Sequence, residues 1–231
     1  MILTYTKNLL VFSIFLLGSF TYQLHAQKKF TGFAEPSVSL NIKSESPWSY
    51  NFTIANRDIL YQKEEFNAEI KHIELAQYTS LSVGLYGKIT AGIRYRFIEM
   101  FDEHKDNEVR LVEQYSYSTK IKNLKASHRF RIAQRFRERT THRFRYRFLV
   151  DIPLNGQRSD VKEFSLSLST ESVFEMGKEE KPSLGQRLNS SLSYQISSNT
   201  KFKFGLEYRY RNYTQTPKTE LFLLTGLSLS L

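Results

Sequence analysis

The chain has 231 residues, with 33 lysines and arginines against 23 aspartates and glutamates, and it contains no cysteine. This length allows one ordinary domain or one mid-sized barrel. The absence of cysteine excludes disulfide bonds, thiolate metal sites and a cysteine nucleophile. The net charge of +10 favours a polyanionic partner such as nucleic acid if the protein is cytoplasmic, because clustered cations displace the counterions of phosphates.

The first residues predict a cleaved secretory signal peptide. Lys7 supplies a positive charge, residues 9–20 form an uncharged apolar stretch, and Ala26 stands at the cleavage position. The apolar stretch is shorter than the about 20 residues that a membrane-spanning helix needs. We therefore predict a signal peptide over 1–26 and an outer-membrane β-barrel domain over 27–231. The alternatives are an uncleaved N-terminal anchor helix and a core helix of a cytoplasmic protein.

Beyond residue 30, apolar residues recur at every second position, which is the pattern of β-strands. Eleven runs show this pattern. They span 33–42, 48–60, 66–84, 86–100, 107–122, 124–138, 140–151, 160–176, 184–197, 199–213 and 219–231. A bacterial single-chain barrel normally has an even number of strands. Because the run 66–84 changes phase between Ile70 and Ile73, we expect that run to be split or spurious.

The arginine-rich stretch 128–148 shows the two faces of such a strand most clearly. Even positions carry aromatic side chains such as Phe130, Phe144 and Phe148, whereas most odd positions carry arginine. A single-stranded nucleic acid needs base stacking and phosphate contacts on one surface. Aromatics and arginines on opposite faces cannot both meet one ligand, so the pattern disfavours nucleic acid as a partner.

Most of the runs are about twice as long as the usual soluble strand of about 5 to 6 residues. About 9 to 11 tilted residues suffice to cross a bilayer. The aromatic faces suit a lipid-facing belt. We therefore predict an all-β fold, a single antiparallel transmembrane β-barrel of about 10 to 12 strands, in the outer membrane of a Gram-negative bacterium. Alternating short and long connections favour tight turns on one side of the membrane and longer loops on the other.

If the aromatic faces contact lipid, the charged faces line the lumen. The lumen-lining candidates are Arg94, Arg96, Glu108, Arg110, Arg129, Arg131, Arg135, Arg137, Arg143, Arg145, Arg147, Glu163, Glu171, Arg187, Glu207 and Arg209. Arginines on neighbouring strands repel one another. Glu108, Glu163, Glu171, Glu175 and Glu207 fall in the same inward register on other strands, so we expect them to pair with the arginines in an arginine–glutamate network. The excess of positive charge favours anions near any passage. The predicted partners are outer-membrane lipid and a small anionic solute.

The chain contains no dinucleotide-binding, P-loop, G-x-S-x-G or H-E-x-x-H motif, so no catalytic residue, cofactor or metal is predicted. The predicted function is a non-enzymatic outer-membrane protein that acts as a small porin-like channel or as a structural membrane protein. Outer-membrane lipases place Ser and His on barrel strands, so a lipid-modifying enzyme using His128 or His142 remains one alternative. A soluble secreted β protein that binds a polyanion is the other.

Six short motifs lie along the predicted strands and their connections: NEVRLVEQY (107–115), HRFRIAQRF (128–136), HRFRYRF (142–148), PLNG (153–156), KPSLGQR (181–187) and LEYR (206–209). In combination they resemble a bacterial family catalogued as a domain of unknown function (number 2490), over nearly all of the mature chain. The resemblance implies an outer-membrane β-barrel and no particular activity. The family often has Glu before Gln in the second motif, where this chain has Ala133, so no fixed charge pair is implied there.

Overall fold

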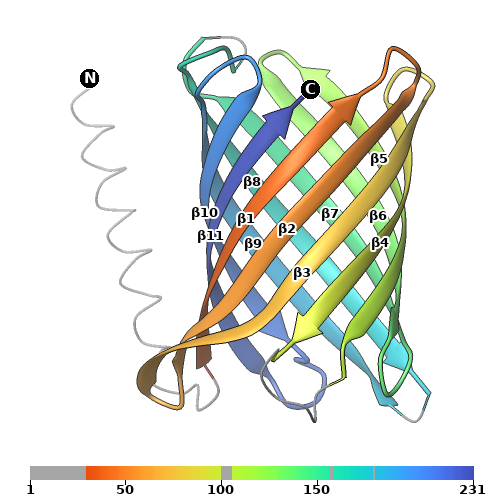
Figure 1. Cartoon of the computed structure of the whole chain (residues 1–231), viewed down its shortest axis with the longest axis vertical. Helices are drawn as coiled ribbons and strands as arrows, with labels where there is room; N and C mark the ends of the chain where they lie inside the picture. Colours follow the sequence, from red (N-terminus) through yellow and green to blue (C-terminus); the bar gives the residue numbers. More distant parts are fainter. Residues whose placement is uncertain (1–29, 100–105, 157–158, 179) are drawn as a thin grey trace, which may run out of the picture.

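The computed structural model describes residues 30–99, 106–156, 159–178 and 180–231, which form a closed barrel of eleven strands (Figure 1). Consecutive strands pair as antiparallel neighbours in chain order. The all-β barrel of about 10 to 12 strands is thereby confirmed. The predicted signal peptide over 1–26 lies outside the described residues. No helix among the described residues combines the length and the hydropathy required to cross a bilayer.

Each of the eleven predicted runs is a strand. The strands are β1 (Phe30–Lys43), β2 (Trp48–Gln62), β3 (Glu65–Val83), β4 (Gly87–Ile98), β5 (Glu108–Ile121), β6 (Leu124–Phe136), β7 (Thr141–Pro153), β8 (Phe164–Gly177), β9 (Glu180–Gln195), β10 (Thr200–Arg211) and β11 (Lys218–Ser230). The expectation that the run 66–84 is split or spurious is therefore wrong.

Strand β3 is continuous because its change of phase is a β-bulge. Arg57 on β2 faces His72, and the next residue, Asp58, faces Ile70, so Lys71 has no partner on β2. One extra residue moves the alternation by one position without ending the strand. Ile70 consequently lies on the outer face, whereas His72 is buried inside the barrel.

The barrel closes through a parallel pair, β1 with β11, in a register that runs from Phe30 opposite Thr219 to Asn41 opposite Ser230. An odd number of up-and-down strands makes the first and last strands run in the same direction. Both run from the end drawn at the bottom of Figure 1, called here the lower end, to the upper end. Closure leaves no free sheet edge.

Connections of different length occur at both ends of the barrel, so the expected separation into a tight-turn side and a long-loop side is wrong. The long connection between β4 and β5 lies at the lower end, and the long connection between β7 and β8 lies at the upper end. Two-residue turns also occur at each end, between β2 and β3 and between β5 and β6.

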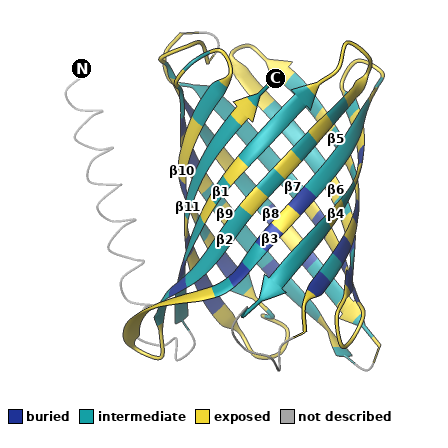
Figure 2. Cartoon of the chain, in the orientation of Figure 1, coloured by how far each residue is buried: buried dark blue, intermediate teal, exposed yellow. Residues whose placement is uncertain are grey.

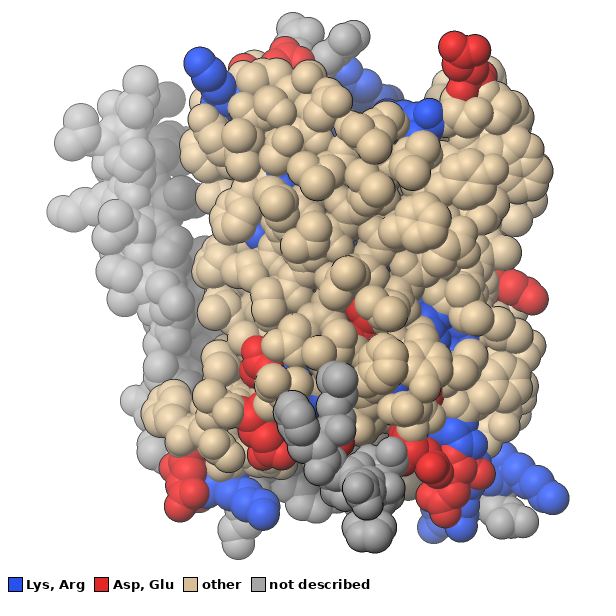
Figure 3. All heavy atoms as spheres, in the orientation of Figure 1, with Lys and Arg blue, Asp and Glu red and all other residues tan. Residues whose placement is uncertain are grey.

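The outer wall is mostly apolar. Large hydrophobic side chains on it, such as Ile93, Leu111, Phe130 and Phe204, are about half exposed. On the face drawn in Figure 3, charged side chains gather toward the two ends and most of the surface between them is uncharged. One exception lies within β5, where Glu113 is exposed between hydrophobic neighbours. The wall thus has the composition of a protein interior.

The interior of the barrel has the opposite composition, because polar and charged residues outnumber hydrophobic ones among its buried side chains. Most of the buried residues lie in the lower half, where Figure 2 shows them in dark blue. The main apolar cluster there joins the two closing strands: Phe33 stacks on Phe222 with 4.7 Å between ring centroids, and Ile59 packs beside them. The guanidinium of Arg209 lies 3.5 Å from the centroid of the Phe222 ring. A cation over an aromatic face is favourable, so this cluster tolerates the charges around it.

Candidate functional site

Fourteen of the sixteen lumen-lining candidates lie within strands, on the face opposite the apolar wall. The two others, Arg137 and Glu163, lie just outside the strands, so the predicted runs 124–138 and 160–176 extend too far at these ends, although Arg137 still lines the cavity described below. Arg137 follows the last residue of β6 and is exposed at the lower mouth of the barrel. Glu163 lies in the connection before β8, where its carboxylate accepts a hydrogen bond from the Asp160 backbone (3.0 Å). Lys162 has a positive φ of 67°, so the chain is still turning there and the strand begins only at Phe164.

The strand register sets several arginines directly opposite one another. Arg129 faces Arg147 and Arg131 faces Arg145 across β6 and β7. Arg110 faces Arg94 on one side and Arg135 on the other. Like charges in direct cross-strand pairs are destabilising. The barrel therefore needs carboxylates that reach these arginines from further strands.

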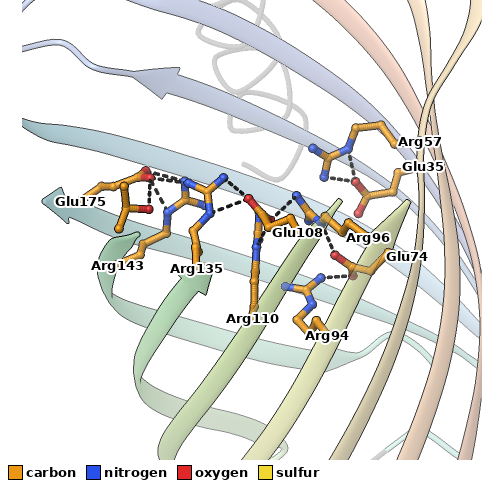
Figure 4. Close-up of polar contacts among 11 residues, drawn as sticks. Glu35, Arg57, Glu74, Arg94, Arg96, Glu108, Arg110, Arg135, Arg143 and Glu175 are labelled. Carbon is orange, nitrogen blue, oxygen red and sulfur yellow. Dashed lines mark hydrogen bonds and ion pairs between the residues drawn. The ribbon is translucent and has the colours of Figure 1, made fainter. Parts of the chain in front are cut away.

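Glu108 is the centre of the first such group and is only 1% exposed. Its carboxylate accepts hydrogen bonds from the Nε of Arg110 and from the Nε (3.1 Å) and Nη2 (2.6 Å) of Arg135. The Nη1 of Arg96 lies 3.8 Å from the same carboxylate. One glutamate on β5 thus offsets the repulsion among guanidinium groups from three strands (Figure 4).

Two further glutamates extend this group on either side. Glu74 on β3 accepts hydrogen bonds from Arg94 and Arg96, and Glu175 on β8 accepts them from Arg135 and Arg143. Ion pairs therefore continue without interruption from β3 to β8, as the dashed lines of Figure 4 trace. We call these residues together with Glu108 and Arg110 the arginine–glutamate network. Its presence confirms the expected pairing of arginines with glutamates inside the barrel.

A second group surrounds Glu171, which is buried at the middle of β8. Its carboxylate lies 2.6 Å from Arg129 Nη2, 3.3 Å from Arg187 Nη1 and 3.6 Å from Arg145 Nη1. Glu207 pairs with Arg209 on β10. The single carboxylate of Glu171 therefore lies beside three guanidinium groups, so the cluster around Glu171 retains an excess of positive charge.

Several residues that take part in these contacts are absent from the predicted set: Glu35, Arg57, Glu74 and Glu220. Alternation carried a signal for Glu35, because it shares a face with Ser37, Ser39 and Asn41, opposite the apolar Val38 and Leu40. Glu74 lies just beyond the bulge in β3, so alternation counted from the start of that strand assigns it to the wrong face.

A cavity of about 400 Å³ lies within the lower half of the barrel, beside the network. Twelve arginines, Lys71 and His72 line it, whereas the lining carboxylates are those of Glu35 and Glu108. Within the described ranges, no group of three or more His, Asp or Glu side chains is arranged to hold a metal ion. The chemistry that the cavity offers is thus a set of converging guanidinium donors.

The two histidines considered for lipid chemistry lie on the outer wall. His128 Nδ1 is 2.9 Å from the hydroxyl of Tyr146, and His142 is exposed near the start of β7. His128 also packs against the ring of Phe148 with 5.1 Å between centroids. The contacts of His128 are therefore those of an aromatic wall residue.

The sequence matches the model of a family, DUF2490, whose description is "Protein of unknown function", over residues 36–220. This range extends from within β1 to within β11, so it contains nearly the whole barrel wall and the complete arginine–glutamate network. No curated protein and no solved structure matches the chain. The eleven-stranded barrel with its buried arginines and glutamates belongs to the DUF2490 family.

Proposed function

We propose that this protein is a non-enzymatic outer-membrane β-barrel that contacts lipid through its outer wall and admits small anions into its lumen. The observation that carries the proposal is the wall itself, because all eleven strands contribute exposed large hydrophobic side chains to it. Soluble monomers rarely expose a contiguous apolar patch of more than a few hundred Å². A bilayer is the environment in which such a wall is favourable.

Aromatic residues near both ends of the wall support this orientation. At the upper end, Trp48 begins β2, and Tyr86 packs edge to face on Tyr117 with 5.9 Å between centroids. At the lower end, Tyr210 stacks on Tyr213 at 5.7 Å. Trp and Tyr are enriched at membrane–water interfaces, because their rings are apolar and their N–H or O–H groups are polar.

The lumen changes character along its length. Its upper half contains small uncharged polar side chains that bond to one another, such as Asn51 with Asn41 (2.8 Å) and Ser118 with Ser127 (2.8 Å). Charged side chains also occur there, because Lys88 donates to Ser49 and Asp151 accepts from Ser167. The lower half of the lumen holds the arginine–glutamate network and the cationic cavity. A solute that enters from above therefore meets guanidinium groups, which favour anions over cations.

Two measurements test the proposal. Membranes that carry the protein are washed with alkaline carbonate, and we expect the barrel to stay in the pellet. The purified barrel is then reconstituted in planar bilayers under a salt gradient, where we expect a reversal potential that indicates anion preference. Release by carbonate would contradict the membrane location, and absence of conductance at every voltage would contradict the passage.

The enzymatic alternative depends on His128 and His142. If either histidine supports lipid turnover, its replacement by alanine will remove that activity from reconstituted barrels. We expect any turnover by the preparation to be the same in the double variant as in the wild type, because both histidines serve as wall residues. Phe130→Ala, a change on the same outer face, controls for disturbance of the wall.

A further inference from the structure

The lower half of the lumen holds more positive charge than its carboxylates balance. Apart from the exposed Arg137 and Arg211, ten arginines and Lys71 line the cavity as cations. Glu35 and Glu108 are the lining carboxylates, and the others that pair with these lining arginines are Glu74, Glu171, Glu175 and Glu207. Burial of unbalanced charge costs several kcal/mol for each ion. Eleven cations against six carboxylates therefore favour the entry of an anion from solvent.

The excess of positive charge is most pronounced at Arg145 on β7. The residues opposite Arg143 and Arg147 on β8 are Glu175 and Glu171, but the residue opposite Arg145 is Val173. On its other side, Arg145 faces Arg131. Among the three inward-facing arginines of β7, Arg145 is thus the one that has no carboxylate directly opposite it on either neighbouring strand.

The donors of Arg145 are correspondingly unused. The residue is 8% exposed, and its Nε and Nη2 have no hydrogen-bond partner among the described residues. Its Nη1 lies 3.6 Å from Glu171, which is too long for a hydrogen bond. Buried donors in folded proteins are nearly always paired. Unused donors on a cavity wall indicate that an acceptor belongs in the cavity.

The neighbours of Arg145 are also cationic. Arg131 and Arg187 line the same cavity: Arg131 faces Arg145 across β6 and β7, and Arg187 approaches the same Glu171 carboxylate as Arg145. Arg131 is held by Gln114, whose Oε1 accepts hydrogen bonds from its Nε (2.9 Å) and Nη2 (2.6 Å). Gly185, the residue opposite Val173 on β9, adds no side chain to the space beyond Arg145. Three guanidinium groups therefore border one region of the cavity.

We propose that Arg145, together with Arg131 and Arg187, binds a multiply charged phosphate-type oxyanion inside the barrel. The planar fork of a guanidinium matches the geometry of phosphate oxygens and donates two parallel hydrogen bonds to them. The cavity volume of about 400 Å³ lies in the range of small-molecule sites and exceeds the space that one phosphate needs. The site accommodates a ligand with one or two phosphate groups. This binding does not depend on the passage proposed above.

Calorimetric titration of the purified mature barrel in non-ionic detergent tests the site. Pyrophosphate is the probe, and the ionic strength is held constant with sodium chloride. We expect saturable binding in the wild type and a loss of affinity of at least about tenfold in Arg145→Gln, because charge-assisted hydrogen bonds are lost. The matched control is Arg139→Gln, which removes the same charge from the exposed turn after β6 and should bind as the wild type does.

Thermal stability separates ligand binding from a structural role of Arg145. Arg145 is a buried cation with two unpaired donors, and its burial therefore destabilises the barrel. Arg145→Gln should consequently unfold at the same temperature as the wild type or at a higher one. If that variant does not fold, Arg131→Gln provides the second test, and it too should lose at least about tenfold in affinity.

Two results would overturn the proposal: pyrophosphate binding no tighter than that of chloride, or equal loss of affinity in Arg145→Gln and Arg139→Gln. A barrel that binds pyrophosphate but passes no current supports the site while it contradicts the passage. The two proposals can therefore fail separately.

Discussion

Replacement of Glu108 by glutamine is the sharpest test of the arginine–glutamate network. The carboxylate of Glu108 is buried and accepts hydrogen bonds from Arg110 and Arg135, with Arg96 at 3.8 Å. Arg135 has a second carboxylate partner, Glu175, but Arg110 pairs with Glu108 alone among the described ion pairs. Glu108→Gln keeps the shape of the side chain and leaves Arg110 as a buried cation without a counterion.

The size of the effect follows from this loss of pairing. Removal of one partner from a buried ion pair costs about 3–5 kcal/mol. Because glutamine keeps one oxygen that can accept a hydrogen bond, we expect a loss near the lower limit, about 3 kcal/mol in the free energy of unfolding. For a chain of this length, such a loss lowers Tm by about 6 to 12 °C.

Urea-induced unfolding in detergent micelles or lipid vesicles measures this change, with far-ultraviolet circular dichroism and the fluorescence of the single tryptophan, Trp48, as probes. Glu138→Gln is the matched control, because Glu138 is exposed in the turn after β6 and should cost less than about 0.5 kcal/mol. If the two variants unfold at the same urea concentration, the buried ion pairs do not stabilise the barrel and the reasoning is wrong.

Three further changes test other parts of the fold. Phe222→Ala removes a fully buried ring that stacks on Phe33 at the parallel seam, and we expect a loss of about 3–5 kcal/mol in the same unfolding assay. Gly92→Ala places a Cβ 2.1 Å from the ring of Tyr78, and such overpacking should cost about 1–3 kcal/mol. Glu113→Leu removes a carboxylate from the outer wall and should stabilise the barrel in lipid vesicles by up to about 2 kcal/mol.

Each of these changes has a matched comparison. Phe202→Ala, on the exposed wall, should cost less than Phe222→Ala when both are measured in detergent. Gly226→Ala meets its nearest atom, Ser37 Oγ, at 3.3 Å and should be milder than Gly92→Ala. Destabilisation by Glu113→Leu in vesicles would count against contact of the wall with lipid.

The strands and their two faces could be predicted from the sequence because alternation is a local property. Phe130 and Arg131 point to opposite sides of β6 wherever that strand lies in a sheet. The parallel strand pair that closes the barrel could not be predicted in this way. Pairing of β1 with β11 joins segments more than 180 residues apart, and the expectation of an even number of strands argued against it.

The faces of the charged residues were more predictable than their partners. Arg129 on β6 pairs with Glu171 on β8, a strand that is not its neighbour, and such contacts depend on how the strands tilt and curve around the lumen. Local backbone geometry accounts for the remaining errors. The bulge at Lys71 reverses the face assigned to Glu74, and the turn that ends at Lys162 keeps Glu163 out of β8.

The parallel seam also limits how the chain can be re-engineered. Circular permutation works in many domains because the two ends of the chain lie close together. Here β1 begins at the lower end and β11 finishes at the upper end, so a linker between them must span the height of the barrel. For strands of this length tilted by about 40°, that height is roughly 30 Å, which requires roughly ten extended residues. A short linker of the kind that joins the ends of an even-stranded barrel would pull the seam apart.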